Sequence, residues 1–472
     1  MLPKYRRLLF SLVALLILAD TAYSFLQYYH HPLDGDVAWN LVPHEQVRQV
    51  LADPLGVSTW LEGKIYPNPN RFFCHWSFRA YFLHVPVWLQ QVTDPVTSVY
   101  LAAGLARIFT QIFLLLLLAR AVRGNWQLDR LEWWLAVLLF VPFFQANGYR
   151  SHIGIVDPSV TYTFFYALPA AVLLLFLLPF IDRFVHGRDS LPGWKIALWV
   201  PLAAMACLSG PLNPATIGVL CATAAVYLLH HRPKQLHRTA DRPYLLLAGW
   251  AAVLALYALW LGTFNSLTIE NAIPLSTRYA QLPEGIFRQF TGKLAWPVLL
   301  TALVIHYLLL RRSAGNEPLL RGYRYGLIFA GLYILLLPLG GFREYRPYML
   351  RYDTILPITL LCLLGYGAGV FAVWNLGPRW RKLYRLLPLA MGLIYTFADE
   401  PGFGQRTCEE SALRRLATAT SDTVVLEADC PVMAWQTFAV PEESTLNVQL
   451  LRAWKIVDRD LRYYHAAESS TE

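Results

Sequence analysis

The chain alternates long apolar runs with short polar segments from its start to about residue 398. A helix needs about 20 apolar residues to cross the hydrocarbon core of a bilayer, and proline within a span is tolerated where neighbouring groups satisfy the freed carbonyls. Several of the runs are shorter than this or contain proline. Eleven runs can be recognised, at residues 8–26, 97–119, 132–147, 161–181, 195–209, 214–230, 244–262, 294–310, 325–340, 354–374 and 384–398. The pattern predicts an all-α polytopic membrane protein with about eleven transmembrane helices.

The polar segments between the runs fall into two sets by charge. One set holds 21 Lys and Arg residues, in segments 1–7, 120–130, 183–195, 231–242, 311–324 and 379–385. The alternate set holds seven, in segments 147–160, 209–215, 263–293 and 340–352. Because Lys- and Arg-rich loops stay in the cytoplasm, we expect the N-terminus inside and the C-terminus outside. The first run is too long for a signal-peptide core and is interpreted as an uncleaved anchor.

The composition supports a membrane protein and argues against nucleic-acid binding. Of the 472 residues, 56% are hydrophobic and 15% are charged, whereas about 25% are charged in soluble domains. The net charge of +9 is spread over short loops and forms no basic face, so it is attributed to topology. The longest polar segments, 28–96 and 399–472, fall on the predicted outer side, where we expect any chemistry. A bacterial inner (plasma) membrane is the expected location.

The first outer loop begins with two carboxylates close to the end of the first run. Asp34 and Asp36 flank Gly35, and glycine permits a tight turn that could point both side chains at one site. Close carboxylates repel each other, so one can keep a raised pKa and act as a general base. Together they could also hold a divalent cation. The alternative is a solvated turn or an N-cap for the next helix.

An aromatic and basic stretch follows in the same loop, at Arg71–Phe82. It suits a helix lying in the membrane interface, and packing of the loop onto the spans is an equal alternative. His75 within it is a candidate substrate-binding residue. Five histidines fall on or near the predicted outer side: His30, His31, His75, His84 and His152. Their spacing matches no metal motif, so packing or hydrogen bonding is favoured over metal ligation.

Three arginines gather in a late outer loop. Arg343, Arg346 and Arg351 lie on the side where the positive-inside rule disfavours them. The planar fork of arginine donors matches phosphate oxygens, so the three form a candidate phosphate clamp. The alternative is that they pair with loop acids such as Glu344 and Asp353.

The acidic turn, the span pattern and the orientation together resemble the GT-C class of integral-membrane glycosyltransferases. Members of this class carry an acidic pair in the first outer loop, soon after the first span. Asp34-Gly35-Asp36 occupies that place. Adjacent acids such as Asp-Glu are usual in the class, and here a glycine separates them. The resemblance therefore leaves both as candidate catalytic residues, with Asp34 slightly favoured as the base.

Two further motifs carry the resemblance. Many members place another acid in the outer loop after the third span, where this chain has Asp157. An Arg-Tyr or Arg-Phe pair that opens a late span, with proline a few residues on, recurs near the lipid phosphate. Arg351-Tyr352, followed by Pro357, matches that pattern. Asp157, Arg351 and Tyr352 are thereby implied as substrate-binding residues.

The resemblance implies an enzyme that moves a hexose or pentose from a polyprenyl-phosphate donor to a glycan, lipid or protein acceptor at the outer membrane face. Inversion at the anomeric carbon is expected by analogy with single-base displacement. A divalent cation is the one cofactor considered. The rival interpretation is a transporter or flippase of lipid-linked glycan, which needs polar residues in mid-span, and Asp20 and Arg107 are the few present. A third is a non-catalytic scaffold that presents the tail to a partner.

The tail beyond the last apolar run is far more polar than the rest of the chain. Its pattern predicts a helix over 409–419, a strand over 422–428 and a second helix over 446–464. We therefore expect a membrane domain over 1–398 and a small outer α/β module over 399–472, which would cap the site. Cys408 and Cys430 could form a disulfide if the tail faces an oxidising compartment.

Overall fold

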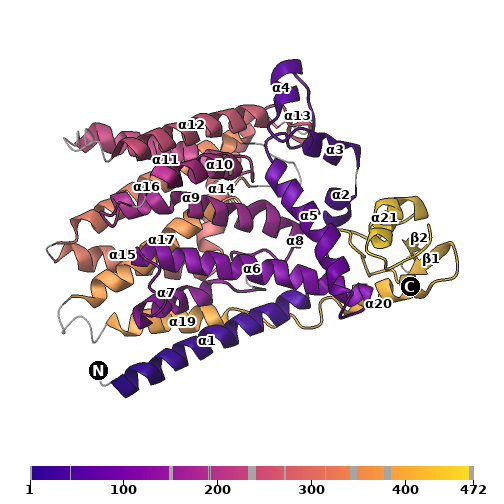
Figure 1. Cartoon of the computed structure of the whole chain (residues 1–472), viewed down its shortest axis with the longest axis horizontal. Helices are drawn as coiled ribbons and strands as arrows, with labels where there is room; N and C mark the ends of the chain where they lie inside the picture. The colour runs from indigo at the N-terminus through magenta and orange to yellow at the C-terminus, as the bar shows by residue number, and fades with distance from the viewer. Residues whose placement is uncertain are drawn as a thin grey trace.

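The computed structural model describes residues 3–42, 44–147, 153–189, 191, 193–231, 241–270, 273–313, 315–340, 348–376 and 384–466. Long helices lie side by side in a bundle, and a smaller group of elements from the C-terminal part of the chain lies at one end of it (Figure 1). That end also carries the segment that follows the first helix. We call it the site end.

Each of the eleven predicted apolar runs contains a helix. These are α1 (Pro3–Tyr29), α6 (Pro95–Arg123), α7 (Leu131–Phe140), α9 (Leu168–Phe184), α10 (Gly193–Cys207), α11 (Asn213–His231), α12 (Arg242–Gly262), α15 (Ala295–Arg311), α16 (Glu317–Leu336), α17 (Leu356–Trp374) and α19 (Leu386–Phe397). Within the described ranges, seven helices are long and apolar enough to cross a membrane, or eight if a bent pair counts as one span. The helices α7, α10 and α19 are shorter. The number of eleven spans and the orientation stay predictions.

Helix α6 is central to the bundle, where it contacts α1, α5, α7, α9 and α17. Its start is fixed by Asp94, whose Oδ1 accepts hydrogen bonds from the backbone N–H groups of Val96 and Thr97. Pro95 occupies the first helical position, where a missing N–H costs nothing. The helix ends at Gly124, which has a φ of +70°. These end signals place the buried side chains of α6 within the bundle.

The segment after α1 folds into four helices at the site end: α2 (Val37–Leu41), α3 (Glu45–Ala52), α4 (Val57–Glu62) and α5 (Phe72–Leu89). Helix α5 contains most of the predicted stretch 71–82. It buries one face, which includes His75, Phe78 and Phe82, against the bundle, while Trp76 and Trp88 are exposed. The loop therefore packs onto the spans along one face of α5.

Three further helical features interrupt or join the long helices. A short helix α8 (Val160–Tyr162) and a π-helical turn η2 (Thr163–Ala167) lead directly into α9. The segment 263–293, expected as a loop, contains α13 (Ser266–Ile269) and the amphipathic α14 (Leu275–Thr291). Helix α14 meets α15 at an angle of 79°. The short 3₁₀ turns η1 (Val141–Phe143) and η5 (Leu337–Leu339) extend α7 and α16.

The C-terminal part contains α20 (Thr407–Thr418), β1 (Thr423–Leu426), η6 (Pro441–Ser444), α21 (Thr445–Ala453) and β2 (Arg462–His465). The two strands are parallel, and Thr423 pairs with Arg462. The helix predicted over 446–464 is wrong beyond Ala453. Its last residues form β2 because they alternate between partly exposed and buried positions and pair with β1.

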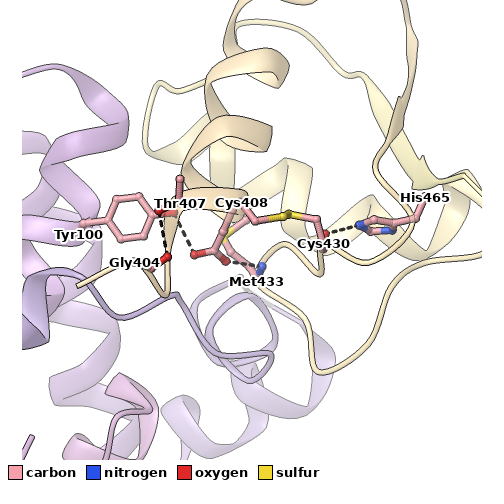
Figure 2. Close-up of a disulfide and its surroundings, with 8 residues drawn as sticks. Tyr100, Gly404, Thr407, Cys408, Cys430, Met433 and His465 are labelled. Atoms are coloured by element: carbon pink, nitrogen blue, oxygen red, sulfur yellow. Dashed lines mark hydrogen bonds between the residues drawn. A yellow bond between two sulfur atoms is a disulfide. The ribbon is translucent and has the colours of Figure 1, made fainter. Parts of the chain in front are cut away.

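The predicted disulfide between Cys408 and Cys430 is present, with its Cα atoms 5.9 Å apart (Figure 2). It joins the start of α20 to the segment that follows β1. The segment after α1 meets the C-terminal part close to this disulfide, because the backbone N–H of Leu33 donates a hydrogen bond to the carboxylate of Glu409. Such a contact requires the segment after α1 and the C-terminal part to lie on one side of a membrane. An odd number of spans, as the sequence predicts, meets this requirement, and an even number does not.

Candidate functional site

The carboxylate of Asp34 fixes the turn that follows α1. The side chain is only 6% exposed, and each of its oxygens accepts a backbone hydrogen bond. The N–H of Asp36 donates to Oδ1 at 3.1 Å, and the N–H of Thr161 donates to Oδ2 at 3.0 Å. Thr161 belongs to α8, more than a hundred residues further along the chain. Asp34 therefore holds the turn against the segment that leads into α9.

Asp36 lies nearer the surface than Asp34 and faces the C-terminal part. Its side chain is half-buried, and Oδ1 accepts a hydrogen bond of 3.2 Å from the indole Nε1 of Trp435. Gly35 lies directly against the same residue. A Cβ at Gly35 would be 2.5 Å from the backbone nitrogen of Trp435, too close for any other residue type without movement of the backbone. The glycine between the two acids is thus required by the close approach of Trp435.

A fully buried arginine lies beneath the turn. Arg107, on α6, donates from Nη1 to the carbonyl oxygen of Tyr28 at 3.0 Å and from Nη2 to that of Pro158. The carboxylates of Asp34, Asp157 and Glu409 are close enough to act on its charge. A buried cation is tolerated only with such compensation. The positive charge of Arg107 therefore offsets three carboxylates that come from three distant parts of the chain.

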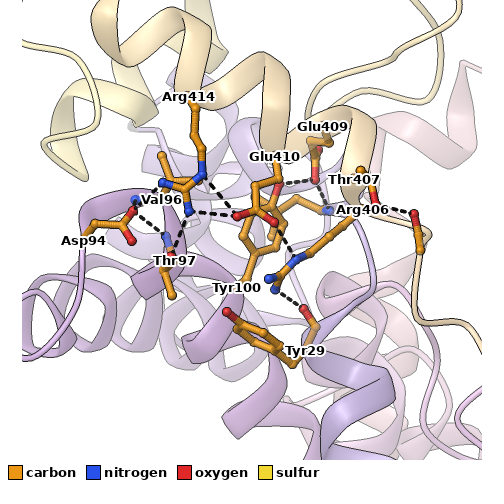
Figure 3. A network of polar contacts seen from close by, with 12 residues as sticks. Tyr29, Asp94, Val96, Thr97, Tyr100, Arg406, Thr407, Glu409, Glu410 and Arg414 are labelled. Atoms are coloured by element: carbon orange, nitrogen blue, oxygen red, sulfur yellow. Dashed lines mark hydrogen bonds and ion pairs between the residues drawn. The ribbon is translucent and has the colours of Figure 1, made fainter.

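Glu409 is the member of this group that comes from the C-terminal part (Figure 3). Its Oε2 accepts from the N–H of Leu33 at 2.8 Å and from the hydroxyl of Tyr100 at 2.9 Å, while Oε1 accepts from the N–H of Met433 at 2.8 Å. Burial raises the pKa of Glu409 to about 7, against these three hydrogen bonds, which favour the ionised form. The carboxylate joins the acidic turn, α6 and the segment before Trp435.

A second network attaches α20 to α6 (Figure 3). The guanidinium of Arg406 lies over the rings of Tyr29 and Tyr100, at 3.7 and 4.6 Å from their centroids. It also pairs with Glu410 at 3.0 Å. Arg414 bridges Glu410 and Asp94, the residue that caps α6. The C-terminal part is thereby fixed on the site end by ionic and aromatic contacts together.

His31 and His75 are both buried, and the pKa of each is low enough to keep the imidazole neutral. His75 is fully buried, lies 4.9 Å from the ring of Phe165, and has a pKa lowered to about 3 by burial and by Arg71. His31 accepts or donates one hydrogen bond of 2.7 Å with Asn147, and burial and Arg107 lower its pKa to about 3. Both histidines therefore pack inside the protein in this structure.

The other predicted residues are placed as follows. Asp157 is buried, and its Oδ1 accepts from the N–H of Ser159 at 2.7 Å, close to the acidic turn through Arg107. Arg351 pairs with the buried Asp353, the alternative that the sequence left open, with an Nε–Oδ1 distance of 3.0 Å. Tyr352, beside it, is half-buried. Arg343 and Arg346 lie outside the described residues.

An apolar cavity of about 90 Å³ opens between η2, α9, α11, α16 and α17. Its walls contain almost no polar surface. Three of its lining residues lie near features already described: Phe165 contacts His75, Tyr166 follows Thr161 by about one helical turn, and Pro357 opens α17 shortly after Arg351. The cavity therefore reaches the segment that holds Asp34 and the segment that carries Arg351.

Among the residues that the structure describes, no group of three or more His, Cys, Asp or Glu side chains is arranged to hold a metal ion. Asp34 and Asp36 are the residues that the sequence offered for a cation. Both oxygens of Asp34 already accept backbone N–H groups, each of which leaves a second lone pair. A cation held here would need most of its ligands from water and substrate phosphate, as Mg²⁺ commonly has.

Sequence reasoning missed Glu409 and Trp435 as members of the site. Glu409 had a detectable signal, because it shares the spacing of the apolar face of α20 with Ala412, Leu413 and Leu416. A carboxylate at a core-facing position is buried only when it is paired or hydrogen-bonded. Trp435 stands in an irregular segment without periodicity, and nothing in the sequence distinguishes it from other tryptophans.

No protein-family model matches this sequence, and no curated protein matches it. Among solved structures, the chain is similar to the crystal structure of ArnT from Cupriavidus metallidurans in the apo state. The similarity covers 98% of this chain and 86% of that one, with 14% sequence identity and a TM-score of 0.44. We base the functional proposal on the residues of the site itself.

Proposed function

We propose that the protein is a GT-C-type membrane glycosyltransferase that moves a sugar from a polyprenyl-phosphate donor to an acceptor at the outer face of the cytoplasmic membrane. One observation carries the proposal: a fixed acidic turn and an apolar cavity share a single segment. Thr161 of that segment holds Asp34, and Tyr166, one turn further on, lines the cavity. A lipid chain in the cavity would thus bring its headgroup to the carboxylates.

In this proposal Asp36 is the reacting carboxylate and Asp34 positions it. Asp36 is the more accessible of the two, whereas both oxygens of Asp34 are occupied by backbone donors. Asp36 takes the proton of the acceptor hydroxyl while the hydroxyl oxygen of the acceptor forms a bond to the anomeric carbon. The bond from that carbon to the lipid phosphate oxygen breaks, and the phosphate leaves with the electron pair. Attack from the opposite face inverts the anomeric carbon.

The leaving phosphate gains negative charge in the transition state and needs positive partners. Arg351, with Arg343 and Arg346, is the proposed partner because Pro357, six residues on, lines the cavity, and the phosphate would share the Arg351 guanidinium with Asp353. Asp34 and Asp36 are the residues that would hold a divalent cation, which would supply positive charge for the same phosphate. The proposed outer location is supported by the Cys408–Cys430 disulfide, since such bonds persist in oxidising compartments.

The deciding measurement is turnover of a panel of polyprenyl-phosphate hexoses and pentoses by the purified protein in liposomes, with crude envelope extract as acceptor. We expect release of free polyprenyl phosphate by the wild type. Asp36→Asn should lower the rate at least about 100-fold, the range typical of a lost general base. Asp34→Asn should lower it as well, through loss of the turn geometry.

Thermal unfolding of each variant in detergent separates a lost carboxylate from a lost fold. A transporter of lipid-linked glycan would move the same lipids across the liposome membrane without releasing polyprenyl phosphate, and that result would replace the enzyme by the rival function. A scaffold would show neither turnover nor transport, and both Asp variants would support growth of a deletion host as the wild type does.

A further inference from the structure

We propose that Trp435, supplied by the C-terminal part, binds the donor sugar ring and positions Asp36. This inference deepens the proposed function and rests on it. Trp435 is 56% exposed, yet its indole N–H is directed at the carboxylate of Asp36 at 3.2 Å. The exposed face of the indole is open to a sugar ring, and its N–H holds the candidate catalytic acid beside that sugar.

Three aromatic rings lead from the apolar cavity to the acidic turn. Tyr166 lines the cavity, and its ring centroid is 5.5 Å from that of Tyr162. The Tyr162 ring is in turn 6.4 Å from that of Trp435. All three side chains keep some exposure. A lipid chain in the cavity would therefore place its first sugar beside Tyr162 and Trp435, which is why we assign the donor sugar to this surface.

The position of Trp435 is fixed from two directions. Glu409 accepts from the backbone N–H of Met433, two residues before Trp435, and from that of Leu33, one residue before Asp34. The disulfide at the neighbouring Cys408 holds Cys430 (Figure 2). A single short stretch of α20 thus clamps the tryptophan segment and the acidic turn together. Gly35 completes the fit because it leaves room for Trp435.

The chemistry of the indole matches a sugar ring. The face of an aromatic ring carries partial negative charge, and the axial C–H groups of a sugar are apolar and weakly positive, so the two stack. The indole N–H remains bonded to Asp36 and holds that carboxylate oriented toward the acceptor proton. Stacking acts on binding, whereas the N–H acts on the reacting group, so the two roles can be separated by mutation.

The test compares Trp435→Phe with Trp435→Ala in the full-length protein. Phe keeps a stacking face and loses the N–H, so we expect kcat to fall about fivefold with KM nearly unchanged. Ala loses both, so KM for the donor should also rise about five- to tenfold. Trp88→Ala, which removes a tryptophan of similar exposure on α5, is the control and should leave both constants unchanged.

A second readout does not depend on turnover. In 5-fluorotryptophan-labelled protein, the ¹⁹F resonance missing from Trp435→Phe identifies Trp435. That resonance should shift on addition of synthetic polyprenyl-phosphate hexoses or pentoses and stay unchanged with sugar-free polyprenyl phosphate. Turnover by the wild type with unaltered constants in Trp435→Ala would overturn this inference and leave the transferase standing. Absence of a shift with every lipid-linked sugar would overturn it too, whereas a shift without any turnover would refute the transferase alone.

Discussion

Two buried arginines on the same helix have opposite surroundings. Arg120, near the end of α6 remote from the site, forms a two-pronged ion pair with Asp182 at 2.8 and 2.6 Å. Arg107, toward the site end, donates hydrogen bonds to two backbone carbonyls. Its interaction with Asp34, Asp157 and Glu409 is electrostatic. Arg120 is neutralised by one dedicated partner. Arg107 instead serves three carboxylates that come from separate parts of the chain.

The difference shows what each charge does. A buried ion pair with its own partner can often be replaced by apolar residues without loss, so it is a structural contact. A buried cation shared among several acids cannot be replaced so simply, because each acid would lose compensation at once. We infer that the site is organised around Arg107 and that Arg120 only joins α6 to α9. Three experiments test this contrast.

The largest effect is expected for Arg107→Met. The substitution leaves Asp34, Asp157 and Glu409 without their cation and two buried carbonyls without a donor. Unfolding stability should fall by about 3–5 kcal/mol, as when one partner of a buried pair is removed. Turnover by the protein that remains folded should fall about 100-fold, the effect of small misplacements at a reacting group. Arg107→Lys should keep part of both, and a variant as active as the wild type would contradict the proposed centre.

The Arg120–Asp182 pair should behave differently. Arg120→Met and Asp182→Leu, made singly, should each cost about 3–5 kcal/mol because the remaining charge stays buried. The double variant should return to within about 1 kcal/mol of the wild type, with unchanged turnover. Thermal unfolding of the three variants in detergent measures this. A double variant as unstable as the singles, or one that is inactive, would show that this pair also belongs to the functional centre.

The smallest effect is a pH dependence that arises at Glu409. Its pKa of about 7 is above its ordinary value of 4.5, so the folded state binds the proton more tightly than the unfolded state. The stabilisation is complete below about pH 4.5 and is lost as the pH rises through 7, a total of about 3 kcal/mol. The groups facing Glu409 are Asp34, Tyr100, Arg107 and Tyr463.

Unfolding stability of the wild type measured from pH 4.5 to 7.5 should therefore decline with rising pH. Glu409→Gln has no proton to lose, so its stability should depend less on pH. Its amide N–H would face the hydrogen-bond donors of Leu33, Tyr100 or Met433, so the variant should also be less stable at every pH. Glu427→Gln, an exposed carboxylate after β1 in the same C-terminal part, is the control and should keep the wild-type slope. A wild-type profile that rises with pH would contradict the raised pKa.

Local patterns in the sequence predict most of the helices but little of the site's connectivity. The apolar runs, the helix in the aromatic stretch, β1 and the Cys408–Cys430 pair each depend on neighbouring residues or on a simple pairing. The helix predicted for the segment that forms β2 was wrong because pairing with β1 decides the conformation of that segment. Asp34 and Asp36 were recognised as a turn, yet their partners Thr161 and Trp435 lie far away in sequence.

The physical reason is that the contacts that complete the site join the two ends of the chain. The bond from Leu33 to Glu409 spans 376 residues, and that from Trp435 to Asp36 spans 399. No periodicity or motif reports such pairings. Gly35 is an instructive case: the sequence indicates a turn, whereas the structure shows that the space is needed by a tryptophan from the other end.

The contact between Trp435 and Asp36 also has a consequence for biosynthesis. Asp36 and Trp435 are 399 residues apart in the chain, so at typical ribosomal speeds of about 5–20 residues per second they are made roughly 20–80 s apart. During that interval the acidic turn stands on the membrane without its tryptophan, its disulfide or Glu409. A nascent chain therefore lacks the contact that holds Asp36 until the segment around Trp435 has been made. Under the proposed function, this delay would keep half-made copies from consuming lipid-linked sugar.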